Sequence, residues 1–212
     1  MQSAPRITVE VPVLSVGSGA GDYEALGNYV DALRRPQGLH LTLLHIGVLA
    51  DFARDIADWT KGNTTAGDAA GTAVAWLEGL PVLAGFAART ERLVLLGGGR
   101  VSGLEVAVPQ HVRDYQVSLV KALHELLDTL LVDNVDDFIL SSQALGFRYP
   151  RWTPHIAVGR PKSRDRGPWD IEPLAVECGP SRIRNRQFLP GPATGEGLRD
   201  QDLGLPGAGD GQ

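Results

Sequence analysis

The chain has 212 residues, 43% of them hydrophobic and 21% charged, which is typical of a globular protein with one domain or two small lobes. The single cysteine, Cys178, excludes an intramolecular disulfide framework and a zinc-thiolate cluster, and it favours a reducing compartment. The formal net charge of −5 argues against a nucleic-acid coat protein, because such proteins gain affinity from many phosphate contacts.

No apolar run approaches the roughly 20 residues that a membrane-spanning helix needs. The N-terminal residues Met1 to Arg6 lack the basic start and the apolar core of a signal peptide. We therefore expect a cytoplasmic protein that has no membrane partner.

The first predicted strand covers residues 7–16, where Pro12 indicates an edge or a bulge. A glycine-rich connection at 17–21 then leads to a predicted helix at 22–35. A dinucleotide-binding fingerprint needs this context, but here the spacing is G-x-G-x-G, and no acidic residue follows about 20 residues on. We interpret the glycines as a flexible connector and keep a dinucleotide-dependent enzyme as an alternative.

Residues 39–47, L-H-L-T-L-L-H-I-G, form a short apolar run after a Pro-Gln-Gly break and predict a buried strand. Side chains two apart on a strand share a face, so His40 and Thr42 point the same way. An imidazole beside a hydroxyl donor suits a phosphate. His45, an odd number of positions from His40, is expected on the opposite face.

The middle of the chain alternates between predicted helices and strands. The helices are expected at 49–59, 69–80 and 110–131, the strands at 82–89, 92–96, 103–108 and 138–141, with a loop at 61–68. Gly97 to Gly99 predict a hairpin loop between two of these strands. The helix at 110–131 has the clearest apolar stripe. We interpret Asp133, Asp136 and Asp137 as a solvated turn rather than a cation site.

A second histidine pattern, T-P-H-I-A-V-G-R, lies at 153–160, where His155 and Ala157 share one strand face. Two further strands are expected at 171–177 and 182–188, and alternation places Arg182, Arg184 and Arg186 on one face of the second. From 148 to 186 nine basic residues stand against four acidic ones, which favours a small anionic ligand near His155.

Two H-x-small strands, L-H-L-T-L-L and P-H-I-A-V-G, one in each half of the chain, resemble the two-histidine phosphoesterase superfamily. That group includes 2′-5′ RNA ligase-like and LigT-like proteins and cyclic nucleotide phosphodiesterases, and the resemblance spans residues 7–188. It implies an α+β fold of two pseudo-symmetric lobes of antiparallel sheet that face a central groove, with helices outside. Each half has a strand, a long helix and an H-x-small strand, at 7–47 and 103–159. We expect one bilobal domain at 1–189 and a disordered Gly/Pro-rich tail at 190–212.

The resemblance implies a metal-independent phosphodiesterase with no cofactor, in which His40 and His155 act as general acid and base and Thr42 holds a phosphate oxygen. The substrate class is 2′-5′ or 2′,3′-cyclic phosphodiesters of RNA ends, cyclic nucleotides or cyclic oligonucleotides, hydrolysed or reversibly ligated. The symmetry of the two motifs leaves open which histidine is the acid. We expect a monomer whose partner is this nucleotide or RNA-end substrate.

One position departs from the family pattern, because Ala157 stands where the family usually has Thr or Ser. A methyl group cannot donate a hydrogen bond, and the loss of one oxyanion donor costs about 10²- to 10³-fold in rate. We therefore expect Arg160, Tyr149 or Arg151 to substitute at the substrate. Trp152 and Tyr149 have two alternative roles, stacking on a base or, as is more common for aromatic residues, filling the core or the rim. The alternative is a non-catalytic protein of the same fold that binds a nucleotide or an RNA end.

Overall fold

The computed structural model describes residues 6–17, 20–142, 144–145, 152–163 and 167–185. The predicted tail at 190–212 lies outside the described residues. The nine strands are β1 (Arg6–Val16), β2 (Val30–Asp31), β3 (His40–Val48), β4 (Phe86–Leu96), β5 (Val101–Ala107), β6 (His155–Pro161), β7 (Trp169–Asp170), β8 (Ala175–Cys178) and β9 (Arg182–Asn185). The helices are α1 (Ala20–Glu24), α2 (Leu49–Trp59), α3 (Ala66–Glu78), α4 (Gln110–Thr129) and α5 (Val135–Ser141), with 3₁₀ turns η1 (Ala25–Asn28) and η2 (Pro36–Gly38).

The strands form one curved sheet in which every described pairing is antiparallel, in the order β2-β6-β3-β1-β8-β4-β5. β6 also pairs with β5, so the path curls back on itself, while β7 adds to β4 and β9 adds to β1. The predicted α+β class with antiparallel strands is confirmed. Because β1 and β3 are antiparallel, they do not form the parallel βαβ unit that a dinucleotide fingerprint requires.

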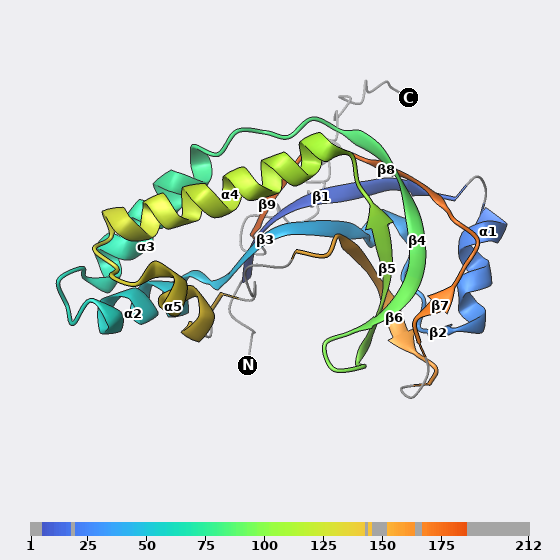
Figure 1. The fold of residues 1–212 in the computed structure, drawn as a ribbon, viewed down its shortest axis with the longest axis horizontal. Helices are drawn as coiled ribbons and strands as arrows, with labels where there is room; N and C mark the ends of the chain where they lie inside the picture. The colour runs from blue at the N-terminus through green and yellow to red at the C-terminus, as the bar shows by residue number, and fades with distance from the viewer. Residues whose placement is uncertain (1–5, 18–19, 143, 146–151, 164–166, 186–212) are drawn as a thin grey trace, which may run out of the picture.

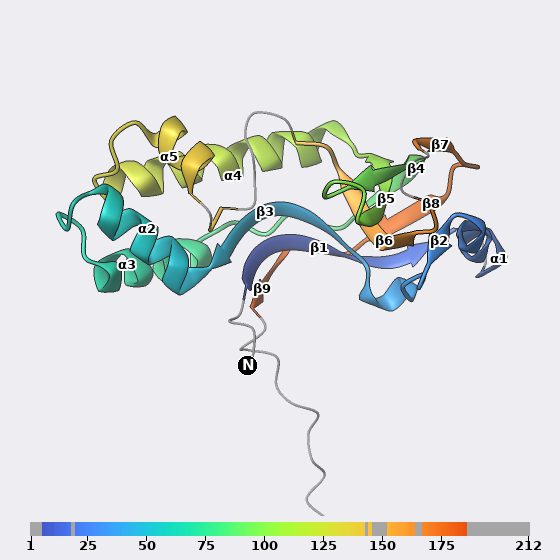
Figure 2. The same cartoon turned by 90° about the horizontal axis from the view of Figure 1, so that it is seen from below.

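Most helices lie together toward one end of the sheet, where α2 to α5 pack side by side, and α1 lies at the opposite end (Figures 1 and 2). The apolar stripe predicted for residues 110–131 is confirmed in α4, whose buried face includes Val112, Leu119, Leu123 and Leu127. This face packs against the buried side of β3. The hydrophobic core therefore lies beneath the first histidine strand and fixes its position.

The predicted helix at 22–35 is wrong. Only α1 and η1 form, and the chain then extends so that Val30 pairs with Pro161 of β6. Gly27 interrupts the helical pattern, and burial of Tyr23, Leu26 and Val30 is achieved without a continuous helix. The first half of the chain therefore lacks the long helix that the pseudo-symmetry required.

Four strand predictions also change. Residues 138–141 belong to helix α5, where Asp136 and Asp137 occupy the first turn and favour the positive end of the helix dipole. The strands expected at 82–89 and 92–96 are one strand, β4, with a register shift between Thr90 and Arg92. Of the strand expected at 171–177, only residues from Ala175 onward form a strand, β8, while β7 lies just before the predicted range.

Pro12 does not mark a sheet edge, because β1 is paired on both sides. On one side β3 pairs with residues 6–12, and on the other β9 pairs with residues 7–10 and β8 with residues 13–16. Pro12 falls between these two ladders, where its carbonyl accepts a 2.9 Å hydrogen bond from the Gly179 N–H. A residue without an N–H is tolerated there.

Gly47, near the end of β3, packs closely against the backbone of Ala144, in the segment before the second motif. Its φ is +82°, and a Cβ at this position would lie 2.0 Å from the carbonyl oxygen of Ala144. We expect Gly47→Ala to lower the free energy of unfolding by about 3 kcal/mol, from steric overlap together with left-handed strain. Gly62 has nearly the same φ, +83°, with open space around it, so Gly62→Ala should cost only about 1 kcal/mol. Urea denaturation of the Gly47→Ala and Gly62→Ala variants separates steric overlap from left-handed backbone strain. Equal losses in the free energy of unfolding would contradict the close approach of Gly47 to Ala144.

Candidate functional site

The first motif lies on β3, where a bulge changes the expected side-chain directions. Glu10 of β1 is opposite Thr42, but Thr8 is opposite His45, so β3 has one extra residue between these pairs. His40, Thr42 and His45 are all half-buried, while Leu43 and Leu44 are both fully buried. The prediction that His45 points away from His40 is therefore wrong, and all three polar side chains share one face.

The second motif lies on β6, beside the first. Leu41 pairs with Ile156 in antiparallel register, and both side chains are fully buried. This register sets Ala157 beside His40 and His155 beside Thr42, with all four side chains on the face opposite the buried pair. The two histidine motifs thus lie on neighbouring antiparallel strands, as a pseudo-twofold arrangement requires.

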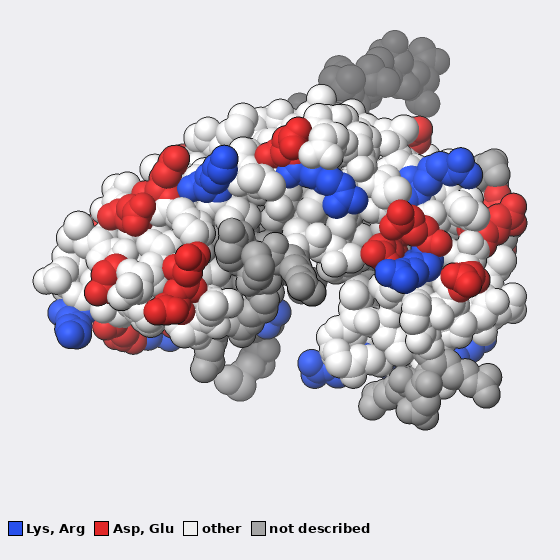
Figure 3. Space-filling view, in the orientation of Figure 1, with Lys and Arg blue, Asp and Glu red and all other residues white. Residues whose placement is uncertain are grey.

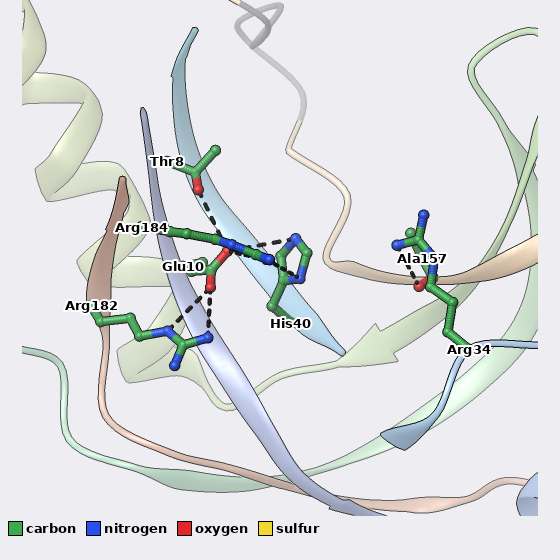
Figure 4. Close-up of polar contacts among 7 residues, drawn as sticks. All are labelled: Thr8, Glu10, Arg34, His40, Ala157, Arg182 and Arg184. Atoms are coloured by element: carbon green, nitrogen blue, oxygen red, sulfur yellow. Dashed lines mark hydrogen bonds and ion pairs between the residues drawn. The ribbon is translucent and has the colours of Figure 1, made fainter. Parts of the chain in front are cut away.

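A buried carboxylate organises the first motif. Glu10 has no solvent exposure, and its Oε1 accepts bonds of 3.1 and 3.0 Å from Nε and Nη2 of Arg182. Its Oε2 lies 3.5 Å from Nη1 of Arg184 and 3.6 Å from Nε2 of His40 (Figure 4). The Thr8 hydroxyl donates to the same oxygen at 3.5 Å. A buried charge is tolerated only when it is paired in this way.

The His40 ring is neutral in this arrangement. Arg184 Nη1 lies 3.2 Å from His40 Nδ1, and because a guanidinium can only donate, Nδ1 must accept. The ring proton then lies on Nε2, which faces Glu10. Burial lowers the pKa of His40 below its ordinary value; Glu10 opposes this effect, and Arg184 adds to it.

His155 is oriented by its own strand. Its Nδ1 lies 2.8 Å from the Thr153 carbonyl, so Nδ1 carries a proton and donates to this acceptor. The Nε2 atom can then exchange a proton with a bound substrate. On the far side of β6, β5 places Glu105 opposite His155, and Glu105 forms an ion pair with Arg92.

Trp152 ties the two motifs together. Its indole N–H donates a 3.1 Å bond to the Thr42 carbonyl, and its ring packs against the core. Trp152 is therefore a structural link between the two motifs, which corresponds to the core-filling alternative rather than to base stacking.

Of the predicted substitutes for the missing donor, Arg160 is the one within the described residues. β6 has one extra residue between Ala157 and Gly159, so the exposed Arg160 returns to the face of His155 and Ala157, and its backbone pairs with Asp31 of β2. Tyr149 and Arg151 lie outside the described residues, as does Arg186. The arginine beside Ala157 is Arg34, whose Nη1 is 3.5 Å from the Ala157 carbonyl oxygen (Figure 4).

Sequence reasoning therefore missed Glu10 and Arg34. A glutamate in the apolar run I-T-V-E-V-P-V was an available signal for Glu10, because a carboxylate on a strand with apolar neighbours needs a partner. The alternation of Arg182 and Arg184 on one face was predicted and is confirmed by their pairing with Glu10. Arg34 gave no such signal, because it was assigned to a helix that does not form.

One face of the molecule carries charges of both signs. Figure 3 shows acidic and basic side chains interspersed on this face, without a continuous basic band. Within the described residues, no group of three or more His, Cys, Asp or Glu gathers as a metal site, and no helix there is long and apolar enough to cross a membrane. Two cavities of about 390 and 260 Å³ lie elsewhere, the larger beside α2 and α5 and the smaller beside η1 and β7.

His45 makes folding sensitive to acid. Burial, and secondarily the charge of Arg6, lowers the pKa of His45 in the folded protein. Below about pH 6.5 the unfolded chain binds a proton that the folded chain does not, so stability falls as the pH drops through this window. We expect His45→Gln to flatten the dependence of the melting temperature on pH between 7 and 5. An unchanged slope would show that other groups dominate it, with His40 the first of these.

The chain was compared with known proteins. No protein-family model matches it, and no curated protein matches it. Similar solved structures include TT0787 of Thermus thermophilus, with 17% identity and a TM-score of 0.41 over 84% of this chain and 83% of that chain. E. coli LigT complexed with 3′-AMP has 12% identity and a TM-score of 0.45 over 86% and 95%. A phosphoesterase has 16% identity and a TM-score of 0.42 over 85% and 95%.

The chain is thus similar in structure to LigT and to a phosphoesterase, and LigT-like proteins are among the groups that the two motifs resemble. What the chain's own residues provide is a pair of histidine strands joined at Leu41 and Ile156, with arginines on both sides.

Proposed function

We propose that this protein is a metal-independent phosphodiesterase that acts on 2′-5′ or 2′,3′-cyclic phosphodiester bonds of RNA ends, cyclic nucleotides or cyclic oligonucleotides. The observation that carries this proposal is the antiparallel pairing of Leu41 with Ile156, from which His40 and His155 lie diagonally on one face, with Thr42 beside His155. Two imidazoles on one face can serve one phosphodiester as general base and general acid.

His40 is the general base in this proposal. Its lowered pKa keeps it neutral at pH 7, and the contact from Arg184 places the lone pair on Nδ1, while the protonated Nε2 faces Glu10 at 3.6 Å. An incoming phosphate competes for Arg184 and uncovers this lone pair. Nδ1 then takes a proton from water, and the resulting imidazolium faces the carboxylate of Glu10.

His155 is the general acid. The oxygen of the activated water bonds to phosphorus, the bond from phosphorus to the ribose oxygen breaks, and protonated His155 gives its Nε2 proton to that oxygen. The Thr153 carbonyl holds the ring through Nδ1 during this transfer. The Thr42 hydroxyl donates to a non-bridging oxygen, where negative charge develops.

The test is an assay of the purified protein in EDTA, against 2′,3′-cyclic nucleotides, 2′-5′-linked dinucleotides and cyclic oligonucleotides, beside His40→Ala. Turnover that survives EDTA and is lost in the variant is the expected result. Turnover that the variant retains in full would contradict the two-histidine mechanism. Ligand binding without any turnover would instead favour the non-catalytic nucleotide-binding or RNA-end-binding protein.

A further inference from the structure

We propose that Arg34 supplies the phosphate contact that Ala157 cannot make, and so replaces the missing hydroxyl donor of the second motif. This inference rests on the proposed function, because it assigns a substrate-binding residue to the same site. It is carried by the position of Arg34 against β6.

The backbone of Arg34 is anchored on both sides. Its N–H donates a 2.8 Å bond to the Val158 carbonyl, and its own carbonyl accepts a 2.8 Å bond from the hydroxyl of Tyr23. Tyr23 is buried, and burial raises its pKa to about 12, so the hydroxyl remains a donor at neutral pH. The residue next to Ala157 on the neighbouring chain segment is therefore fixed without help from the Arg34 side chain.

The Arg34 guanidinium can exchange its weak contact with the Ala157 carbonyl for a contact with a phosphate, and it has little structural role of its own. Its contact to the Ala157 carbonyl is 3.5 Å long, near the limit of a hydrogen bond, and engages Nη1 alone. A guanidinium has five N–H donors, and the Arg34 side chain is exposed. A phosphate oxygen would bind these donors more strongly than a distant carbonyl does.

The charge of Arg34 also reaches the first motif. After burial and Arg184, Arg34 contributes to the lowering of the His40 pKa, so its cationic end lies within electrostatic reach of that ring. An anion bound between His40 and Ala157 would therefore contact Thr42 from one side and Arg34 from the other. The register at Leu41 and Ile156 places Ala157 directly beside His40.

A double-mutant cycle between Arg34 and Ala157 tests this assignment. In the wild type we expect Ala157→Thr to change kcat/KM by less than about threefold, because Arg34 already fills the role. Arg34→Ala should lower kcat/KM by about 10²-fold, and Ala157→Thr added to Arg34→Ala should restore at least tenfold of this loss. The matched control is Arg35→Ala, because Arg35 is also exposed and its side chain makes no capping bond at η2.

The readouts separate this proposal from the proposed function. kcat/KM is measured on 2′,3′-cyclic AMP, binding of 2′-AMP by calorimetry, and the melting temperature for every variant. If the wild type binds 2′-AMP without turnover, the enzyme proposal fails, and Arg34 is judged by whether Arg34→Ala weakens binding at least tenfold and Ala157→Thr restores it. Unchanged binding and rate in Arg34→Ala overturn the Arg34 proposal alone.

A purely structural role for Arg34 predicts a different pattern. Arg34→Ala would then lower the melting temperature along with activity, and Ala157→Thr would restore neither, which overturns the proposal. A wild type that neither binds 2′-AMP nor turns over any substrate overturns both proposals together.

Discussion

Replacement of His155 by alanine is expected to lower kcat/KM on a 2′,3′-cyclic nucleotide by about 10²- to 10⁴-fold. The loss in kcat/KM on a nucleoside p-nitrophenyl phosphodiester should be far smaller. The reason is the role proposed for His155 as general acid. A ribose oxygen must be protonated as it leaves, whereas p-nitrophenolate leaves as an anion near neutral pH. An acid is therefore needed for the first substrate and not for the second.

His40→Ala is the matched comparison. A general base activates the nucleophile whatever the leaving group, so this variant should lose about 10²- to 10⁴-fold on both substrates. Initial-rate assays at pH 7 in EDTA measure the loss in kcat/KM of each variant on each of the two substrates. If His155→Ala and His40→Ala lose the same factor on both substrates, the division of roles is wrong.

The pH dependence gives an independent check on the same assignment. With His40 as base, the wild-type kcat/KM should rise with pH through a pKa below the ordinary histidine value, because burial and Arg184 lower the pKa of His40. Glu10 opposes this lowering, so Glu10→Gln should move the rise to still lower pH. A rise that stays at the same pH in Glu10→Gln would remove Glu10 as a positioning residue for His40.

The parts of this site that sequence could predict are those set by local pattern. The apolar runs around His40 and His155 specify short buried strands, and β3 and β6 begin at these residues. Helix α2 has the predicted bounds, and α4 nearly so, because their apolar spacing is regular. Alternation also placed Arg182 and Arg184 on one face before their partner was known.

The remaining parts depend on contacts between distant segments. The direction of His45 follows from a bulge that exists only because β1 pairs with β3 in a shifted register. The place of Arg34 follows from the pairing of residues 30–31 with β6, which overrode a helical pattern. Glu10 became a functional candidate only when β9 brought its arginines alongside β1. None of these pairings leaves a local trace in the sequence.

The double variant Arg182→Ala/Arg184→Ala is expected to lower the free energy of unfolding by about 3–5 kcal/mol at pH 8, where His40 is neutral because burial lowers its pKa. Of the partners of Glu10 among the described residues, it leaves the Thr8 hydroxyl and the neutral His40 imidazole, and Glu10 itself has no solvent exposure. An unpaired carboxylate at a buried position cannot recover the hydration that folding removed. The exposed pair of Arg54 and Asp51 provides the control, since Arg54→Ala should leave the urea midpoint nearly unchanged.

Adding Glu10→Met to the double variant distinguishes charge from packing. If the cost comes from the unpaired carboxylate, the triple variant should regain most of the lost stability, because an apolar side chain of similar volume needs no partner. If the triple variant is as unstable as the double variant, the arginine stems stabilise β9 by packing, and Glu10 contributes little through its charge. The triple variant should nevertheless remain inactive, because recovery of the fold does not return Arg184 or the carboxylate to His40. If stability is regained without activity, Glu10 and its two arginines, Arg182 and Arg184, contribute to catalysis as well as to the stability of the fold.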